Sequence, residues 1–278
     1  MNAAKITRES KSNLALAFVA LGRERRDDIT VFYAFCRVID DIADSDEMET
    51  QDKARALANW RRWIREREEA EPALAGDVRA LYRKYPIKPE MLDEIIDGVE
   101  MDLETVRYAT FEELRLYCYR VASAVGLVSI EIFGYRNPAC REYAIELGFA
   151  LQLTNIIRDV GKDLLNDRIY LPREDLKEFG YSETQLRTRT YNDAFVRLME
   201  FEATRAAEFF SRAAAVLPRE DRRSMVAAEI MASVYHALLR RMKADRFRVF
   251  DKEYKLSKIE KGGRVAGQLL RLSLNAGR

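Results

Sequence analysis

Two short stretches of the sequence place side-chain oxygens at helical spacing within apolar surroundings. The first, YAFCRVIDDIAD (residues 33–44), contains Asp40, Asp41 and Asp44. A helix of about 3.6 residues per turn brings Asp40 and Asp44 onto one face and places Arg37 one turn before Asp41. Like charges at this spacing repel each other, and a bound divalent cation would offset that repulsion. An acidic surface at a helix C-terminus explains the same residues.

The second stretch, QLTNIIRDVGKD (residues 152–163), repeats this arrangement with Arg158 beside the row of oxygens. Mg²⁺ binds a few protein oxygens and keeps its other positions for water and phosphate, while arginine binds phosphate oxygens in a bidentate manner. Two such rows, each with an adjacent arginine, predict a magnesium site that faces a diphosphate. For the arginines, an ion pair that only holds the aspartates is the alternative. The second row consists of Gln152, Asn155, Asp159 and Asp163.

Helices must position both rows, because apolar residues recur three and four positions apart and the strict alternation of strands is scarce. The six prolines fall between the periodic segments, where a missing amide donor interrupts a helix least. We therefore predict an all-α fold in a single domain, residues 1–278, that residues 166–191 interrupt as an ordered excursion. Helices are expected over residues 12–22, 27–45, 50–70, 88–105, 111–135, 138–165, 192–216, 220–248 and 260–276.

The charge balance excludes a nucleic-acid-binding function. The chain has 47 Lys and Arg against 46 Asp and Glu, so no overall positive field draws it onto a phosphate backbone. The charged run at residues 61–71 is expected to be the solvated face of a helix. Three widely spaced cysteines among apolar residues indicate reduced core thiols rather than disulfides or a zinc site.

The sequence predicts a cytoplasmic location. No uninterrupted apolar run approaches the roughly 20 residues that span a bilayer, and the N-terminus lacks a secretory apolar region. The last segment, residues 251–278, combines lysines and arginines with an apolar stripe. Such a helix either lies on an anionic membrane surface or packs its stripe on the protein. Peripheral contact at the inner face of the membrane is therefore a second expectation.

Three stretches of the chain resemble the signatures of one family. LGFALQLTNIIRDVGKD (residues 147–163), followed by RIYLP (residues 168–172), is similar to the second signature of squalene and phytoene synthases. YCYRVASAVG (residues 117–126) resembles the first signature, and YAFCRVIDD (residues 33–41) resembles the aspartate-rich motif. The resemblance extends from about Ser10 to Ser257. It implies the isoprenoid synthase fold, a single bundle of helices around a central active-site cavity.

The resemblance also implies roles for individual residues, since family members hold Mg²⁺ between two helices against the diphosphate of an allylic substrate. The implied Mg²⁺ ligands are Asp40, Asp41 and Asp44 on one wall and Asn155, Asp159 and Asp163 on the other. The implied catalytic residues are Asp40, Asp44, Asp159, Asp163 and Tyr117. The implied substrate contacts are Ser10, Ser12, Asn13, Tyr33, Arg37, Val121, Val125, Gln152, Arg158, Arg168 and Tyr235.

Some of these residues have a structural explanation as well. Residues 10–13 are also explained as the N-cap of a helix, and the small residues of the stretch 121–126 by helix packing alone. Phe149 is as well explained by the core as by the cavity. His236 has no metal-ligand spacing and is expected to be structural.

Within the family, DGVEMDLE (residues 97–104) and residues 116–127 look most like bacterial presqualene diphosphate and squalene synthases of hopanoid pathways. The resemblance thus implies that two farnesyl diphosphates join into presqualene diphosphate, with NADPH as a cofactor if squalene is the final product. A phytoene synthase that joins two geranylgeranyl diphosphates is the alternative. A non-catalytic relative would lack the aspartates, and a head-to-tail elongase would lack the signatures at residues 117–126 and 168–172. The oligomeric state does not follow from the sequence.

Overall fold

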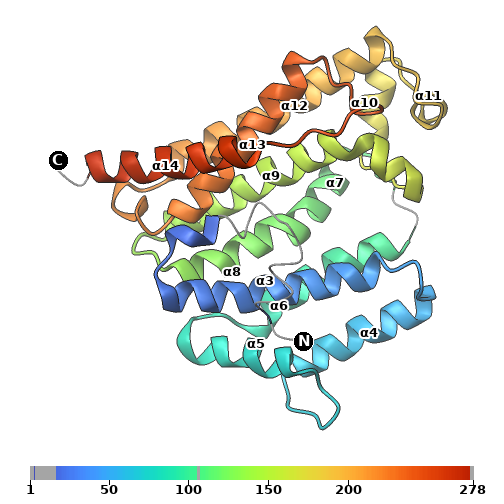
Figure 1. The fold of residues 1–278 in the computed structure, drawn as a ribbon. Coiled ribbons are helices and arrows are strands. Elements are labelled where there is room, and N and C mark those ends of the chain that lie inside the picture. Colours follow the sequence, from blue (N-terminus) through green and yellow to red (C-terminus); the bar gives the residue numbers. More distant parts are fainter. Residues whose placement is uncertain (1–2, 4–16, 105–106, 276–278) are drawn as a thin grey trace.

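The computed structural model describes Ala3, residues 17–104 and residues 107–275, which form a bundle of helices (Figure 1). These residues contain no strand, only one isolated bridge between Arg107 and Ile169. The predicted all-α fold is therefore confirmed. The helix predicted over residues 12–22 lies mostly outside the described residues, and its end is the short turn η1 (Phe18–Ala20).

The first half of the bundle includes a helix that the sequence analysis missed. Residues 73–84 place Leu74, Val78 and Leu81 on a buried face, at the spacing of a short amphipathic helix between two prolines. The helix predicted over residues 50–70 ends at Trp63 instead, before a charged loop. The helices of this half are α3 (Arg23–Ala43), α4 (Thr50–Trp63), α5 (Ala73–Lys84) and α6 (Pro89–Glu100), followed by the turn η2 (Met101–Leu103).

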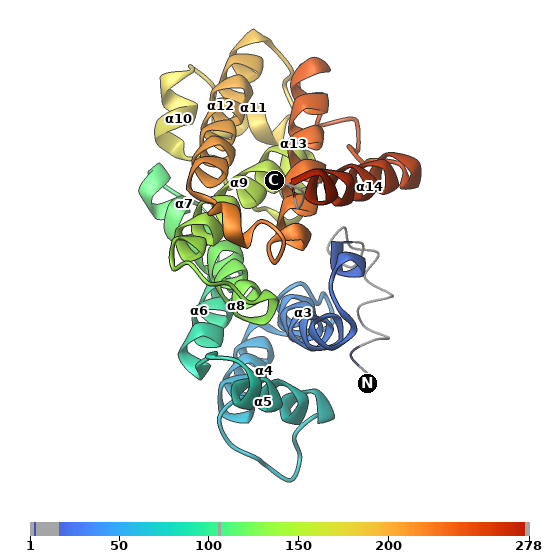
Figure 2. The same cartoon turned by 90° about the vertical axis from the view of Figure 1, so that its left-hand side faces the viewer.

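The second half is built around a long helix, α9 (Ala139–Asp163), which packs against α8 on one side and α12 on the other (Figures 1 and 2). The predicted excursion at residues 166–191 is ordered and holds two short helices that were not expected, α10 (Arg173–Glu178) and α11 (Glu183–Arg187). The remaining helices are α7 (Phe111–Cys118), α8 (Ala124–Phe133), α12 (Asp193–Val216), α13 (Val226–Ala244) and α14 (Lys258–Asn275).

A π-helical turn, Tyr119–Ser123, joins α7 to α8 within what the sequence predicts as one helix. Two glycines let this turn lie close to its neighbours. A Cβ on Gly148 of α9 would come within 2.5 Å of the Ser123 Cα, and one on Gly98 of α6 within 2.7 Å of the Arg120 Cβ. The turn is therefore clamped between α6 and α9, which fixes how the start of α8 faces the interior. Such turns often occur at functional sites.

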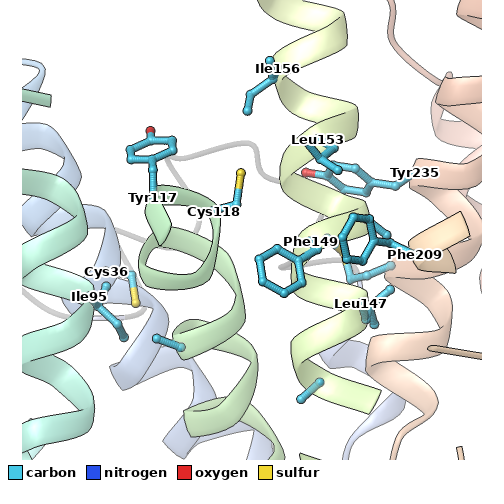
Figure 3. Packing of buried hydrophobic residues seen from close by; sticks show 14 of the residues in the cluster. Cys36, Ile95, Tyr117, Cys118, Leu147, Phe149, Leu153, Ile156, Phe209 and Tyr235 are labelled. Atoms are coloured by element: carbon cyan, nitrogen blue, oxygen red, sulfur yellow. The ribbon is translucent and has the colours of Figure 1, made fainter. Parts of the chain in front are cut away.

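Large apolar side chains fill the space where α7, α9, α12 and α13 meet (Figure 3). Phe149 of α9 and Phe209 of α12 pack with their ring centroids 4.9 Å apart. Phe149 is 3% exposed and therefore belongs to the core, as one of its two predicted roles requires. The three cysteines are buried free thiols, as predicted, and burial raises the pKa of each.

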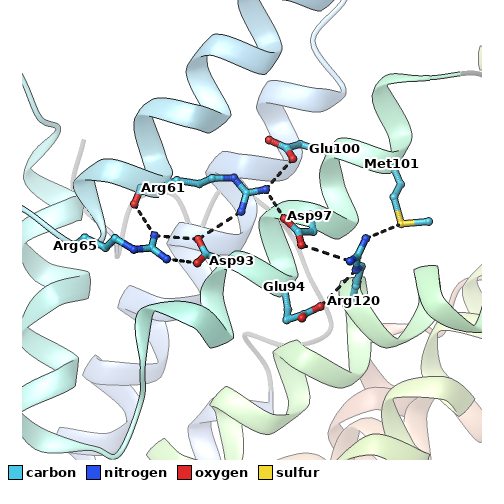
Figure 4. A network of polar contacts seen from close by, with 8 residues as sticks. All are labelled: Arg61, Arg65, Asp93, Glu94, Asp97, Glu100, Met101 and Arg120. Atoms are coloured by element: carbon cyan, nitrogen blue, oxygen red, sulfur yellow. Dashed lines mark hydrogen bonds and ion pairs between the residues drawn. The ribbon is translucent and has the colours of Figure 1, made fainter.

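Ion pairs connect α4, α6 and the π turn on the other side of the bundle (Figure 4). Arg61 contacts Asp97 and also donates to Glu100 at 2.7 Å. Arg120 of the π turn lies 3.4 Å from the second oxygen of Asp97. Arg61 therefore links α4 to α6. This contact corrects the expectation that the charged run at residues 61–71 is only the solvated face of a helix.

One helix among the described residues, Phe111–Phe133, is long and apolar enough to cross a membrane, with a mean hydropathy of 1.4. The sequence analysis expects no such helix because it considers only uninterrupted apolar runs. The helix Phe111–Phe133 contains a few charged residues that interrupt its apolar run. The buried share of its most apolar window is 56%, and it packs against α6 and α9. These contacts are those of a core helix.

Candidate active site

The two predicted rows of oxygens lie on separate helices whose ends are linked. Asp40 lies in the last turn of α3, and Asp44 follows that helix directly. Arg168, in the segment after α9, donates to Asp44 Oδ1 at 2.8 Å. This ion pair joins two predicted site residues that are 124 positions apart in the sequence. The motif at residues 168–172 therefore meets the end of the aspartate-rich motif.

A further carboxylate, which the sequence analysis missed, lies between these helices. Asp102 of η2 accepts a hydrogen bond from the Tyr117 hydroxyl at 2.9 Å and another from the Tyr170 hydroxyl at 2.7 Å. The two rings stack with centroids 5.1 Å apart. Tyr117, predicted to be catalytic, is thus held in place by Asp102. In the sequence, Asp102 follows an apolar helical stretch and lies in the segment 97–104 that resembles one subfamily. This position is the signal that could have identified it as a site residue.

Asp40 is exposed at the end of α3, yet protein atoms surround its carboxyl group closely. The resulting desolvation raises its pKa to about 7, against the opposing charge of Arg37 and with help from the charges of Asp44, Asp102 and Asp41. Because desolvation disfavours the anion, a metal-free Asp40 is protonated for a large part of the time at neutral pH. A cation at this position would restore the carboxylate.

Asp163, at the end of α9 on the opposite wall, also has a raised pKa. Desolvation and the charge of Asp159 raise its pKa to about 7, while Arg168 and Lys162 oppose the shift. Asp102 contributes to the raised pKa values of both Asp163 and Asp40, so one field of negative charge extends over both walls. Such clustered, perturbed carboxylates are typical of functional sites.

The side-chain oxygen of Asn155 indicates whether a cation fits this site. Asn155 uses its amide nitrogen to donate to Gln152 at 3.3 Å, while its buried Oδ1 has no hydrogen-bond partner in the described part of the chain. A buried acceptor without a partner is costly, and a metal ion or its bound water would satisfy it. The residues present therefore fit Mg²⁺.

The side chains do not enclose one ion by themselves. Within residues 17–104 and 107–275, no three His, Cys, Asp or Glu side chains come close enough to hold a metal. This spacing suits Mg²⁺ that completes its shell with phosphate and water. Asp41, a predicted ligand, instead pairs with Arg37 at 2.5 Å and is 53% exposed. The structure thus groups Asp41 with Arg37 and away from the other aspartates of its motif.

Arg158 forms an ion pair with Asp159, which is the predicted alternative to phosphate binding. Its guanidinium binds both oxygens of Asp159, at 2.9 and 2.5 Å. In the ligand-free protein, the arginine therefore neutralises a predicted metal ligand. A metal ion and a diphosphate would each compete for one partner of this pair.

Two cavities of different character meet at Tyr235 of α13. One, of about 190 Å³, is mostly apolar and lies between α8, α9 and α13, with Val121, Val125, Gln152 and Asn155 in its lining. The other, of about 580 Å³, is lined by Asp159 and by several cations. Tyr235 lines both cavities. The cations are Arg158, Lys162, Arg189, Lys252, Lys255 and Lys261.

The lysines of this second cavity were assigned differently from sequence. The sequence predicts that Lys252, Lys255 and Lys261 belong to a segment that either lies on a membrane surface or packs on the protein, and the structure places them around a cavity that contains Asp159. Their approach to α9 depends on the packing of residues 249–256 and has no sequence signal. Predicted residue Tyr33 packs edge-on against Phe18, which lines the apolar cavity. Predicted contacts Ser10, Ser12 and Asn13 lie outside the described residues.

Comparison with known proteins accounts for this geometry. The sequence model of the family described as Squalene/phytoene synthase matches residues 7–260. The chain belongs to this family. It is 34% identical to the phytoene synthase of Mycobacterium tuberculosis over 275 residues, covering 98% of this chain and 90% of the relative. It is 37% identical to the presqualene diphosphate synthase of Rhodopseudomonas palustris over 252 residues, covering 90% of each.

Solved structures agree. A dehydrosqualene synthase in complex with a ligand superposes with a TM-score of 0.85 at 26% identity, covering 98% of this chain and 95% of that one. The squalene synthase HpnC from Alicyclobacillus acidocaldarius gives a TM-score of 0.78 at 25% identity, covering 88% and 93%. The predicted isoprenoid synthase fold is confirmed. This synthase is a prenyltransferase of a family that condenses prenyl diphosphates head to head.

Proposed function

We propose that this synthase joins two molecules of farnesyl diphosphate into presqualene diphosphate with the help of Mg²⁺. The observation that carries the proposal is Tyr235, which lines both a cationic and an apolar cavity. A prenyl diphosphate has a charged head and an apolar tail, so its reacting carbon would lie where the two cavities meet. A relative named presqualene diphosphate synthase supports this choice.

The chemistry requires the loss of one diphosphate and the attack of a double bond. The C1–O bond of one substrate breaks to give an allylic cation and inorganic diphosphate. The double bond of the second substrate attacks this cation, a proton leaves, and a cyclopropane closes. Bound Mg²⁺ would supply positive charge to the leaving diphosphate. Asp40 and Asp44 would hold it on one wall, and Asn155, Asp159 and Asp163 on the other.

The protein's own residues would do the rest. Arg158 and Lys162 would bind diphosphate oxygens at the cationic cavity, where arginine gives bidentate contacts. Val121 and Val125 would contact the tail in the apolar cavity, which excludes water from the cation. Tyr117, fixed by Asp102, remains the candidate residue to face the reacting carbons.

The length of the prenyl chain and the end product are the finer choices. The relative named presqualene diphosphate synthase favours the shorter, farnesyl chain. Relatives named phytoene synthase favour geranylgeranyl diphosphate as the second candidate. Reduction of presqualene diphosphate to squalene would need NADPH as a hydride donor.

Product analysis tests the whole proposal. Purified protein would be incubated with farnesyl or geranylgeranyl diphosphate and Mg²⁺, with and without NADPH. We expect presqualene diphosphate from farnesyl diphosphate, no product in excess chelator, and recovery when Mg²⁺ is restored. Phytoene from geranylgeranyl diphosphate alone would establish the second candidate. Full turnover in excess chelator would contradict the two-wall metal site.

A further inference from the structure

A third cavity, of about 330 Å³, lies on the face of α13 that points away from the active site. It is enclosed by α9, α12, α13 and α14, and Figure 2 shows α14 beside α13. Two rows of polar residues line it, one from each of two helices. Ser233, His236 and Arg240 come from α13, and Arg264, Gln268 and Arg271 come from α14.

The positive charges of this cavity are not neutralised by the protein. Among the residues that the structure describes, neither Arg240 nor Arg271 forms an ion pair or hydrogen bond. Glu229 is the one carboxylate in the lining, and it accepts a hydrogen bond from Tyr143 at 2.7 Å without pairing to an arginine. By contrast, Arg241, one position along α13, pairs with Glu260. Within the described residues, Arg241 beside the cavity has a carboxylate partner, and the arginines lining the cavity have none.

Arg264 is held in place with donor capacity to spare. One terminal nitrogen donates to both the carbonyl and the hydroxyl of Ser233 at 3.0 Å, while its buried Nε has no acceptor among the residues of known placement. A buried guanidinium nitrogen without an acceptor is unusual and costs free energy. The charge is therefore positioned by the fold before any ligand arrives.

The field in the cavity can be judged from its one histidine. His236 stacks on Phe210, with ring centroids 5.3 Å apart. Burial lowers the pKa of His236, and the charges of Arg240 and Arg264 lower it further. The imidazole is thus neutral at pH 7 and able to donate one hydrogen bond.

We propose that this cavity, lined by Arg240, Arg264 and Arg271, is a binding site for a phosphate-type oxyanion. Arginine guanidinium groups suit tetrahedral phosphate oxygens, and the volume is within the range of small-ligand sites, about 300–1,000 Å³. The anion would supply the acceptors that these side chains lack. The proposal does not depend on which prenyl diphosphate the enzyme uses.

The position of the site gives it a route to the catalytic side. Tyr143 and Leu147 of α9 line both this cavity and the apolar cavity. Tyr143 is fixed by its hydrogen bond to Glu229. An anion bound in this cavity would attract the arginines that lie next to α9. Because α9 also lines the apolar cavity, such a movement would occur beside the active site.

Hydrogen exchange can localise binding to this site. The full-length protein, with chelator present to keep metal out of the active site, would be titrated with inorganic phosphate, and exchange would be followed over residues 229–244 and 258–275. We expect phosphate to slow exchange in both segments. The variant Arg240→Gln/Arg271→Gln removes two exposed charges and keeps the contacts of Arg264, so it should fold and bind phosphate at least about 10-fold more weakly. Lys243→Gln removes an exposed charge from α13 outside the cavity and should change nothing.

A parallel titration with vesicles that contain phosphatidic acid distinguishes the source of the phosphate group. Protection by inorganic phosphate identifies a free oxyanion, and protection by the vesicles alone identifies a lipid headgroup, provided that Arg240→Gln/Arg271→Gln abolishes it. Equal affinity in that variant, an equal loss in Lys243→Gln, or no protection by either ligand would overturn the proposal. Phosphate at the active-site cations is recognised separately, because it would protect α9 around Arg158 and persist in the variant.

Discussion

At the scale of single residues, the site stores unfavourable charge that a metal would relieve. Desolvation keeps the pKa values of Asp40 and Asp163 near 7, and Asn155 has a buried oxygen without a donor. Arg158 neutralises Asp159 in the absence of a ligand. The buried oxygen of Asn155 disfavours the empty site, whereas the protons on Asp40 and Asp163 and the Arg158–Asp159 ion pair are what a metal ion and a diphosphate must displace.

Removal of one anionic oxygen should therefore separate activity from stability. Asp40→Asn and Asp159→Asn should each lower turnover at least ~10²-fold, as does loss of a preorganised charge partner. The melting temperature of the metal-free protein should stay the same or rise for Asp40→Asn, because repulsion between carboxylates decreases. It should fall for Asp159→Asn, because Arg158 loses its ion-pair partner. Steady-state kinetics and thermal unfolding measure the two effects. Asp46→Asn, a change at a nearby exposed aspartate, is the control, and wild-type turnover in both site variants would show that these carboxylates are only solvated.

Magnesium affinity should depend on pH in a defined direction. Asp40 and Asp163 have pKa values of about 7 without metal, so Mg²⁺ must displace protons below that pH. We expect affinity to fall as the pH decreases from 8 to 6, with proton release at pH 6.5 and little at pH 8.5. Calorimetry in buffers of different ionisation enthalpy measures both quantities. An affinity independent of pH over this range would contradict the raised pKa values.

The same shifts predict how the stability of the metal-free protein varies with pH. Both carboxyl groups bind protons more tightly in the folded protein than in the unfolded chain, where they titrate near pH ~4. Their contribution to folding therefore becomes less favourable as pH rises from about 4 to 7 and stays constant above 7. Mg²⁺ should consequently stabilise the protein most at pH 8.

At the scale of elements, the π turn at Tyr119–Ser123 is the feature that sets the apolar cavity. It lies between Gly98 of α6 and Gly148 of α9, and it presents Val121 to the cavity. The Ser123 hydroxyl donates to the Ile145 carbonyl at 2.8 Å, which ties the turn to α9. Close packing on both sides leaves the turn little freedom to move.

Gly148→Ala should displace this turn. Its Cβ would lie 2.5 Å from the Ser123 Cα and 2.7 Å from the Ser123 nitrogen, both of which are backbone atoms that cannot rotate away. We expect a loss of about 1–3 kcal/mol in the free energy of unfolding, as for other overpacked sites. Gly262→Ala is the matched control, since its Cβ meets nothing within 4 Å, and should stabilise α14 by about 0.5–1 kcal/mol. Denaturant unfolding measures both; equal effects would mean that close approach at Gly148 is not required.

At the scale of the whole molecule, one part of the apolar stripe of α14 packs on the protein and another part is exposed to solvent. Val265 and Leu272 pack against the core, and Gln268 donates to the Glu229 carbonyl at 3.3 Å. Ile259 and Leu270 remain 88% and 64% exposed. They are 11 positions apart, about three turns, and so share one outward face. Packing on the protein therefore accounts for part of the stripe, and membrane contact stays a prediction for the rest.

Vesicle co-sedimentation tests that prediction. Binding should require anionic lipid, because the exposed Lys258 accompanies the stripe, and it should weaken with salt, which screens charge within about 10 Å at 0.1 M. Ile259→Ser with Leu270→Ser should reduce it without disturbing the packed residues. Equal binding to neutral vesicles, or none at low salt, would assign α14 to helix packing alone.

The sequence by itself determined the features that depend on neighbours along the chain. Helical spacing placed Asp40 with Asp44, and Asn155 with Asp159 and Asp163, because one turn of helix fixes those distances. Apolar periodicity predicted the all-α class for the same reason. Even the register of α12, expected over residues 192–216 and found at Asp193–Val216, follows from local signals, since Asn192 caps its first turn.

Only the tertiary structure decided which of these groups meet. Asp102 joins the site because Tyr117 and Tyr170, 53 positions apart, both donate to it. Asp41 is grouped with Arg37 although it is the immediate neighbour of Asp40. The lysines after α13 line the same cavity as Asp159, and the arginines of α13 and α14 line a cavity of their own. Such contacts depend on how whole helices pack, and the crossing of two helices is set by side chains from many distant positions at once.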